Sequence, residues 1–130
     1  EYIDTDMQIE KKTGRSIPEI FSSRGEEAFR KIESEVICEA GKKSGAVIAT
    51  GGGAVTRDEN YRHLKQNGMV FFIERELELL EKKGRPLSKI EEQDKMYERR
   101  LPLYHRFADI KVQNNASPEA AADKIASHFI

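Results

Sequence analysis

The sequence predicts an α/β fold of three layers, with helices on both faces of a mostly parallel sheet. Short continuous apolar runs, typical of buried parallel strands, occur at residues 45–49 and 69–73. Other segments repeat apolar residues every three or four positions, which is the period of an amphipathic helix. Because strands and helices alternate along 130 residues, we expect one α/β domain.

The first third of the chain is expected to hold one strand and three helices. The strand runs into Asp4-Thr5-Asp6, and a short helix then continues to Gly14. The capping-box spacing of serine and glutamate at 16–19 starts a second helix, which Gly25 ends, and a third helix covers 26–40. The apolar residues that these two helices should bury are Ile17, Ile20, Phe21, Phe29, Ile32, Val36 and Ala40.

Three consecutive glycines, Gly51, Gly52 and Gly53, follow the apolar run at 45–49. A strand that ends without side chains lets a ligand approach its backbone. In open parallel sheets, ligands bind at this end of the strands. A flexible loop is the alternative interpretation. A second capping-box spacing, with Thr56 as the cap, starts a fourth helix that ends at Gly68.

The second half of the chain repeats the alternation of strands and helices. Short strands are expected at 69–73 and 110–112, and helices at 74–83, at 89–100 and from Ser117 onward. Pro102 should disrupt the helix before it, because proline lacks the backbone donor that a helix interior uses.

Composition narrows the classes of partner. Lys and Arg number 22 and Asp and Glu 23, so the net charge of −1 favours neither nucleic-acid nor membrane-surface binding. Cys38 is the single cysteine of the chain, and no apolar run approaches the roughly 20 residues of a membrane span. His63, His105 and His128 lack metal-ligand spacing. A soluble protein of the reducing cytoplasm is therefore expected.

Two carboxylates, Asp4 and Asp6, stand two residues apart at the end of the first predicted strand. Strand alternation would place both side chains on one side. Such a pair suits a magnesium-water ligand beside a group that accepts a proton from a substrate hydroxyl. The alternative is that Asp6 caps the following helix while Asp4 is solvated.

Arginines are the other candidates for a ligand site. Arg30 lies beside the apolar stripe of the third helix and could clamp a carboxylate or phosphate, or it could be a surface arginine. Arg85, between Gly84 and Pro86, could close over a phosphate, as any exposed loop arginine could. Arg100 lies near a predicted helix end, where a cation also favours the helix dipole.

Six segments, taken in order, resemble shikimate kinases. They are residues 2–6, 13–21, 25–33, 50–55, 84–87 and 100–104. The resemblance covers essentially the whole chain. It implies a P-loop kinase fold that transfers the γ-phosphoryl group of ATP, with Mg²⁺, to the 3-hydroxyl of shikimate. This reaction belongs to the chorismate pathway of aromatic amino-acid synthesis.

The same resemblance implies roles for the two carboxylates and the lid. Asp6 would hold and activate the substrate hydroxyl, and Asp4 would bind magnesium through water. Arg85 would move with a lid and neutralise charge on the transferring phosphate. Phosphoryl transfer depends mainly on positioning and charge stabilisation, which agrees with this division of roles.

For substrate binding, the resemblance implies that Arg30 and Arg100 grip the shikimate carboxylate. The backbone N–H groups of Gly51, Gly52 and Gly53 would fix the ring hydroxyls. Glu33, one helical turn after Arg30, would orient that arginine. The complete enzyme would be a monomer that binds its small-molecule substrate without nucleic acid or membrane.

One part of the family pattern is missing from these 130 residues. Shikimate kinases begin with a strand and a Gly-x-x-x-x-Gly-Lys-Ser/Thr phosphate loop, and that strand is central to the sheet. Residues 1–130 are therefore expected to be a shikimate kinase-like domain that lacks its N-terminal portion. The alternatives are a shikimate-binding chain without catalysis, or another small-molecule P-loop kinase such as gluconate or nucleoside monophosphate kinase.

Overall fold

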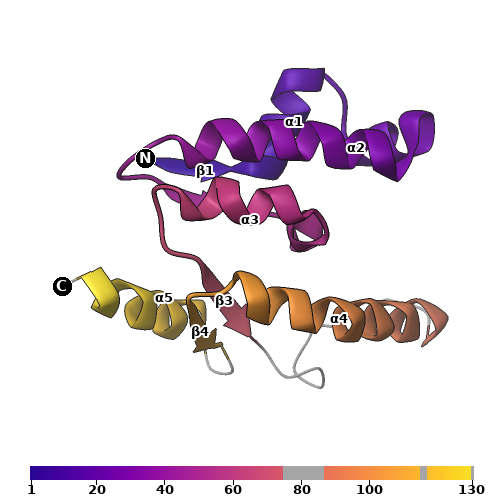
Figure 1. Cartoon of the computed structure of the whole chain (residues 1–130). Helices are drawn as coiled ribbons and strands as arrows, with labels where there is room; N and C mark the ends of the chain where they lie inside the picture. Colours follow the sequence, from indigo (N-terminus) through magenta and orange to yellow (C-terminus); the bar gives the residue numbers. More distant parts are fainter. Residues whose placement is uncertain (75–86, 115–116, 130) are drawn as a thin grey trace. The chain divides into compact units, whose positions relative to one another are not determined.

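The computed structural model describes residues 1–74, 87–114 and 117–129. Figure 1 shows the helices and strands in chain order. The chain forms two compact units, Glu1–Gly68 and Met69–Ile130. Each unit pairs two parallel strands and packs helices against them, so each has α/β character by itself.

The first unit contains two strands, three α-helices and a short 3-10 helix. In chain order these are β1 (Tyr2–Asp4), α1 (Thr5–Thr13), α2 (Ile17–Gly41), β2 (Val47–Ala49), η1 (Gly52–Thr56) and α3 (Asp58–Lys65). Strands β1 and β2 are parallel, with Ile3 opposite Ile48. Helix α2 packs against both α1 and α3.

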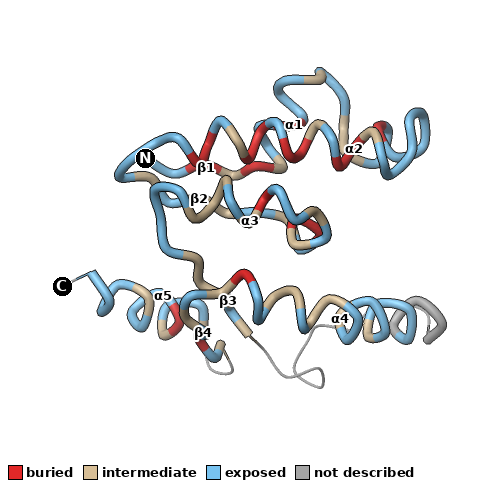
Figure 2. Tube along the Cα trace, in the orientation of Figure 1, coloured by how far each residue is buried: buried red, intermediate tan, exposed pale blue. Residues whose placement is uncertain are grey.

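Apolar side chains of α1 and α2 form the core of this unit. Ile9, Ile20, Phe29 and Val36 make one buried cluster. Figure 2 shows the buried positions following α1 and α2. On the other side of α2, Gly41 lies so close to the backbone of His63 that a side-chain carbon there would overlap it. The glycine therefore lets α2 and α3 approach closely.

The helix boundaries predicted at Gly14, Ser16 and Gly25 are confirmed, whereas α3 ends at Lys65, before the predicted Gly68. Gly14 ends α1 in the left-handed conformation, with φ of 68°. The Ser16 hydroxyl accepts a hydrogen bond from the Glu19 N–H at 3.3 Å and caps α2. Gly25 breaks the helical path inside α2, with φ of 84° and ψ of 172°. The sequence therefore locates these ends correctly because each depends on local chemistry.

Two expectations about buried apolar residues are wrong. Phe21 is exposed, although its ring contacts the Phe29 ring of the cluster at 4.6 Å between centroids. Val47 of β2 is 67% exposed, so the strand before the glycines is parallel but not buried. Its neighbour in β1, Tyr2, is exposed as well, which leaves one face of this strand pair uncovered.

The predicted cap at Thr56 is also wrong. Helix α3 begins at Asp58, and its N-cap position is Arg57, which makes no side-chain capping bond. The Thr56 hydroxyl instead donates a hydrogen bond backward to the carbonyl of Gly53 at 2.6 Å. A 3-10 turn that the sequence pattern does not reveal, η1, takes up the residues between the glycines and α3.

The second unit contains β3 (Phe71–Glu74), α4 (Leu87–Phe107), β4 (Ile110–Gln113), α5 (Pro118–Ala126) and η3 (Ser127–Phe129). Strands β3 and β4 are parallel, with Phe71 opposite Ile110. The Ser117 hydroxyl accepts a hydrogen bond from the Ala120 N–H at 3.1 Å, which confirms the predicted cap of α5.

Helix α4 contradicts the prediction for Pro102, because it continues through the proline to Phe107. Contacts beyond the proline hold the helix: Phe107 is buried, and the Tyr104 ring stacks on Phe72 at 5.0 Å between centroids. Ile73 of β3 is exposed although its apolar run predicts burial. Most of the helix predicted at 74–83 lies outside the described residues.

The strands of the described residues form two separate parallel pairs, β1-β2 and β3-β4. Parallel pairing and the alternation of strands with helices confirm the predicted α/β class. Within those residues, β2 is not paired to β3. The central strand that the family resemblance implies remains a prediction. Among the helices that the structure describes, none has the length and apolar character needed to cross a bilayer.

Candidate functional site

The two predicted carboxylates lie where β1 passes into α1. Asp4 is the N-cap of α1: its Oδ1 accepts hydrogen bonds from the N–H groups of Asp6 at 3.0 Å and Met7 at 3.4 Å. The proposed alternative, with Asp6 as the cap, is therefore wrong. Strand alternation does not relate the two side chains either, because Asp6 already belongs to the helix. The Asp6 carboxylate does not cap α1 and can therefore contact residues outside this helix.

Asp6 faces the glycine segment, Gly51–Gly53. A side-chain carbon on Gly51 would lie 3.2 Å from Asp6 Oδ1 and 3.3 Å from Oδ2. Partial burial raises the pKa of the Asp6 carboxyl above its ordinary value of 3.8, and the nearby charges of Asp4 and Glu10 raise it further. The positive charge of Arg30 lowers the pKa of Asp6 and partly offsets these effects. Asp6 is thus a more basic carboxylate than an exposed aspartate, which suits it to accept a proton.

The raised pKa of Asp6 should make the free energy of unfolding depend on pH. The folded state holds the Asp6 proton to higher pH than the unfolded state, so the contribution of Asp6 to stability falls as pH rises from below 3.8 through the folded pKa. Thermal unfolding from about pH 3 to pH 7 should therefore show Asp6→Asn gaining stability relative to the wild type. The gain should be small, because solvent screens this partly exposed group.

Asp4→Asn provides the matched variant for this test. Asparagine caps helices about as well as aspartate, so α1 should keep its N-terminus. Removal of the Asp4 charge should lower the pKa of Asp6, which a carboxyl NMR titration measures directly. A pKa of Asp6 that stays unchanged in Asp4→Asn would contradict the assigned coupling.

Arg30 is a buried arginine with two acidic partners. Its side chain keeps 8% of its surface, so the alternative of a surface arginine is wrong. Nη1 donates to Glu33 Oε1 at 2.9 Å, and Nε donates to Glu26 Oε2 at 3.3 Å. The guanidinium carbon lies 5.1 Å from the centre of the Phe29 ring. The carboxylate of Glu33 is itself 1% exposed, so the pair is fixed inside the unit.

The glycine segment contacts both groups. Gly53 lies against the guanidinium of Arg30, and a side-chain carbon on Gly53 would overlap it. Among the described residues, positive φ occurs at Gly14, Gly25 and Gly45, so the segment does not need glycine for its backbone angles. It needs glycine for space, because the Asp6 carboxylate and the Arg30 guanidinium lie close to its backbone. The approach of a ligand to this backbone remains a prediction.

The structure brings together four parts of the predicted site in the first unit: Asp4, Asp6, Arg30 and the glycine segment. Arg100 belongs to α4 of the second unit, where it is half-buried. Arg85 lies outside the described residues.

Two polar side chains behind the glycine segment were not predicted. Asn60 is fully buried, and its Nδ2 donates to the carbonyl of Ala54 at 2.9 Å. Thr56 bonds the carbonyl of Gly53. A sequence signal for Asn60 exists: it shares a face of α3 with Leu64, one turn later, where an apolar residue is expected.

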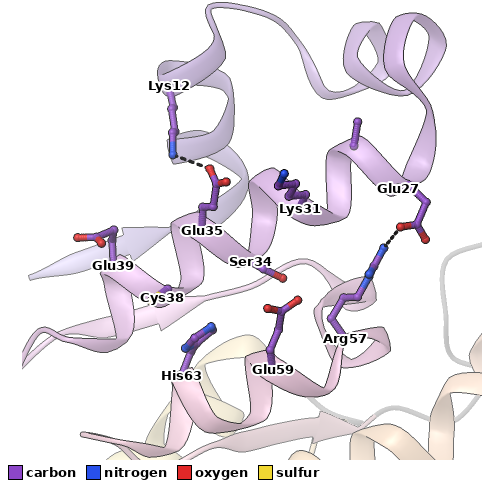
Figure 3. A pocket seen from close by; sticks show the side chains of 11 residues that line it. Lys12, Glu27, Lys31, Ser34, Glu35, Cys38, Glu39, Arg57, Glu59 and His63 are labelled. Carbon is purple, nitrogen blue, oxygen red and sulfur yellow. Dashed lines mark hydrogen bonds and ion pairs between the residues drawn. The ribbon is translucent and has the colours of Figure 1, made fainter.

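A separate groove of about 750 Å³ lies along α1, α2 and α3. Figure 3 shows that two ion pairs cross it: Lys12 with Glu35 at 3.1 Å, and Arg57 with Glu27 at 2.6 Å. None of the predicted site residues lines it. The Arg57–Glu27 pair joins the start of α3 to α2, and the Lys12–Glu35 pair joins α1 to α2. The groove is therefore best explained by helix packing.

The Asp4 carboxylate could bind Mg²⁺ through water. Asp4 uses Oδ1 for the cap, which leaves Oδ2 outside those two bonds. Mg²⁺ commonly takes one or two carboxylates and completes its shell with water and phosphate, so Asp4 fits a water-mediated ligand. Within the described residues, no group of three or more His, Cys, Asp or Glu side chains is placed to hold a metal. A phosphate cradle for ATP is not among these residues, since the 130-residue sequence has no Gly-x-x-x-x-Gly-Lys-Ser/Thr motif.

Comparisons with known proteins agree on one family. The family model described as shikimate kinase matches residues 1–129. The shikimate kinase of Thermodesulfovibrio yellowstonii is 37% identical over 139 aligned positions, covering 99% of this chain and 80% of that protein. The shikimate kinase of Aquifex aeolicus is 36% identical over 131 positions, covering 95% of this chain and 77% of the relative.

Solved structures give the same result. The shikimate kinase of Acinetobacter baumannii in complex with shikimate has a TM-score of 0.86 at 32% identity, covering 99% of this chain and 78% of that chain. The crystal structure of the Aquifex aeolicus shikimate kinase has a TM-score of 0.82 at 33% identity, covering 98% and 80%. Sequence and fold therefore agree that this chain belongs to the shikimate kinase family.

Proposed function

We propose that the protein is a shikimate kinase, which transfers the γ-phosphoryl group of ATP to the 3-hydroxyl of shikimate in aromatic amino-acid synthesis. Family membership supports the reaction class. The observation that carries the proposal is the convergence of the Asp6 carboxylate and the buried Arg30 guanidinium on one glycine segment. A carboxylate that can accept a proton and a cation that can hold an acid suit a substrate with a hydroxyl and a carboxylate group.

Arg30 would bind the carboxylate of shikimate. Glu33 and Glu26 hold its Nη1 and Nε, so the guanidinium is oriented before any ligand arrives. Preorganisation reduces the entropy that binding must overcome. Arg100 is the second arginine proposed for the same carboxylate. The backbone N–H groups of Gly51–Gly53 are proposed to hydrogen-bond the ring hydroxyls.

Asp6 would act as the general base. In the transfer step, the 3-hydroxyl oxygen of shikimate bonds the γ-phosphorus, the bond from that phosphorus to the bridging oxygen of ATP breaks, and ADP leaves. The hydroxyl proton passes to the Asp6 carboxylate, whose raised pKa favours this transfer. Asp4 would hold Mg²⁺ through water, and Arg85 would stabilise the charge of the transferring group.

We also propose that the enzyme works as a monomer in the reducing cytoplasm. Composition supports the compartment, since Cys38 is the single cysteine of these 130 residues. Native mass measurement of the purified protein tests the monomer.

Product analysis tests the proposed reaction. The protein, purified from its native source, is incubated with ATP, Mg²⁺ and shikimate, and ³¹P NMR identifies the product. A new phosphate monoester on the 3-hydroxyl of shikimate is expected, while gluconate and nucleoside monophosphates stay unmodified. The second candidate is a chain that binds shikimate without catalysis, which would use the contacts of Asp6 and Arg30 with the glycine segment for binding alone. Shikimate binding without product would select that candidate, and the absence of both would exclude both.

A further inference from the structure

We infer that Thr56 and Asn60 are positioning residues for the substrate, because together they fix the backbone of the glycine segment. This inference rests on the proposed function, since the segment is taken to bind shikimate. Neither residue faces Asp6 or Arg30 in the contacts described above. Instead they donate hydrogen bonds to the backbone carbonyl groups of Gly53 and Ala54.

Three hydrogen bonds close the segment into one shape. The Ala54 N–H donates to the carbonyl of Gly51 at 3.2 Å, which forms the turn. The Thr56 hydroxyl holds the carbonyl of Gly53 at 2.6 Å, and the Asn60 amide holds the carbonyl of Ala54 at 2.9 Å. Because each peptide group is planar, these bonds fix the peptide planes on both sides of Ala54.

Fixing these planes matters because of what the segment touches. Gly51 lies beside the Asp6 carboxylate, and Gly53 lies beside the Arg30 guanidinium. Glycine loses more conformational freedom on ordering than any other residue, so a free run of three glycines would lose that entropy on binding. The hydrogen bonds from Thr56 and Asn60 order the glycine segment before the ligand binds. They also set its distance from the Asp6 and Arg30 side chains.

The orphaned oxygen of Asn60 supports a positional role for its amide. Asn60 Oδ1 is buried and has no hydrogen-bond partner within the part of the chain that the structure describes. An unpaired buried acceptor is destabilising, and an apolar residue of similar volume would avoid that cost. The Nδ2 donor to Ala54 is the compensating interaction that this residue provides.

Thr56 gives the cleanest test, because it is exposed and can be changed without disturbing the core. Thr56→Val keeps the shape and removes the hydroxyl, whereas Thr56→Ser keeps the hydroxyl. Asn60→Leu removes the amide inside the core, and Ile37→Val, in the buried part of α2, is the control for general loss of stability. Shikimate Kd is measured by calorimetry, and exchange of the Ala54 amide proton is followed by NMR.

Thr56→Val should raise the Kd for shikimate about threefold to tenfold and speed exchange of the Ala54 amide, since one hydrogen bond is lost. Asn60→Leu should do the same at least as strongly. Thr56→Ser and Ile37→Val should bind as the wild type does. If the wild type binds shikimate and Thr56→Val and Asn60→Leu bind it equally well, this inference is overturned while the proposed function stands. An equal loss of affinity in Ile37→Val would overturn it in the same way. A wild type that does not bind shikimate would overturn the proposed function itself.

Discussion

Arg30→Met is expected to weaken shikimate binding by about 100-fold or more, the largest effect on affinity of any single change in the site. Removing one partner of a desolvated, hydrogen-bonded charge pair typically costs about 2–5 kcal/mol. Arg30 meets these conditions, because it is buried and already oriented by Glu33 and Glu26. Isothermal titration calorimetry with shikimate measures the change.

A second effect of Arg30→Met must be separated from this one. The change removes the Arg30 partner of the Glu33 carboxylate, which is 1% exposed. Breaking a buried ion pair in this way destabilises a protein by about 3–5 kcal/mol. The double variant Arg30→Met, Glu33→Leu removes both charges and should recover most of the lost stability. It should still fail to bind shikimate. Binding within threefold of the wild type by the double variant would remove Arg30 from the substrate site.

Asp6→Asn is expected to lower turnover by about 10²- to 10⁴-fold, which is the usual contribution of a positioned general base. Shikimate affinity should change little, because asparagine can still hydrogen-bond a hydroxyl but cannot take its proton. Turnover is followed by ADP release, and affinity by calorimetry on the same preparation. The pattern expected is a large fall in kcat with a nearly constant Kd.

Asp123→Asn is the matched control for this change, since it removes an equal charge from an exposed position of α5. Its kcat should equal that of the wild type. Equal losses of affinity and turnover in Asp6→Asn would make Asp6 a binding residue only. Unchanged turnover in Asp6→Asn would exclude it as the base.

The features that the sequence predicts well depend on chemistry within a few residues. Ser16, Gly14 and Ser117 mark helix ends through caps and left-handed turns that involve only neighbouring backbone groups. The break at Gly25 has the same origin. Parallel strands could be predicted from their apolar runs, but their burial could not, because burial depends on which other elements cover a strand.

The errors arise where distant contacts decide the local structure. Pro102 does not end α4, because packing of Tyr104 and Phe107 beyond it holds the helix. Thr56 has the spacing of a cap, yet its hydroxyl bonds a glycine carbonyl that the sequence does not place within reach. At the N-terminus of α1, the early end of β1 makes Asp4 rather than Asp6 the cap.

The candidate site shows the same division. Asp6, Arg30 and the glycine segment could be selected from residue type and from the resemblance to a family. Their mutual contact could not, because no periodicity relates residues that lie on α1, α2 and the turn after β2. The burial of Asn60 could be inferred from the α3 face that it shares with Leu64, but its hydrogen bond to Ala54 could not, because the two residues lie on different elements.

Amide NMR during a shikimate titration tests the central claim most directly, since it locates the ligand on the chain residue by residue. The account predicts the largest shifts at Gly51–Gly53, with further shifts at Asp6 and Arg30, and none in the groove along α1, α2 and α3 around Glu39 and His63. No shifts at saturating shikimate, or shifts confined to that groove, would contradict the assignment of the glycine segment as the substrate site.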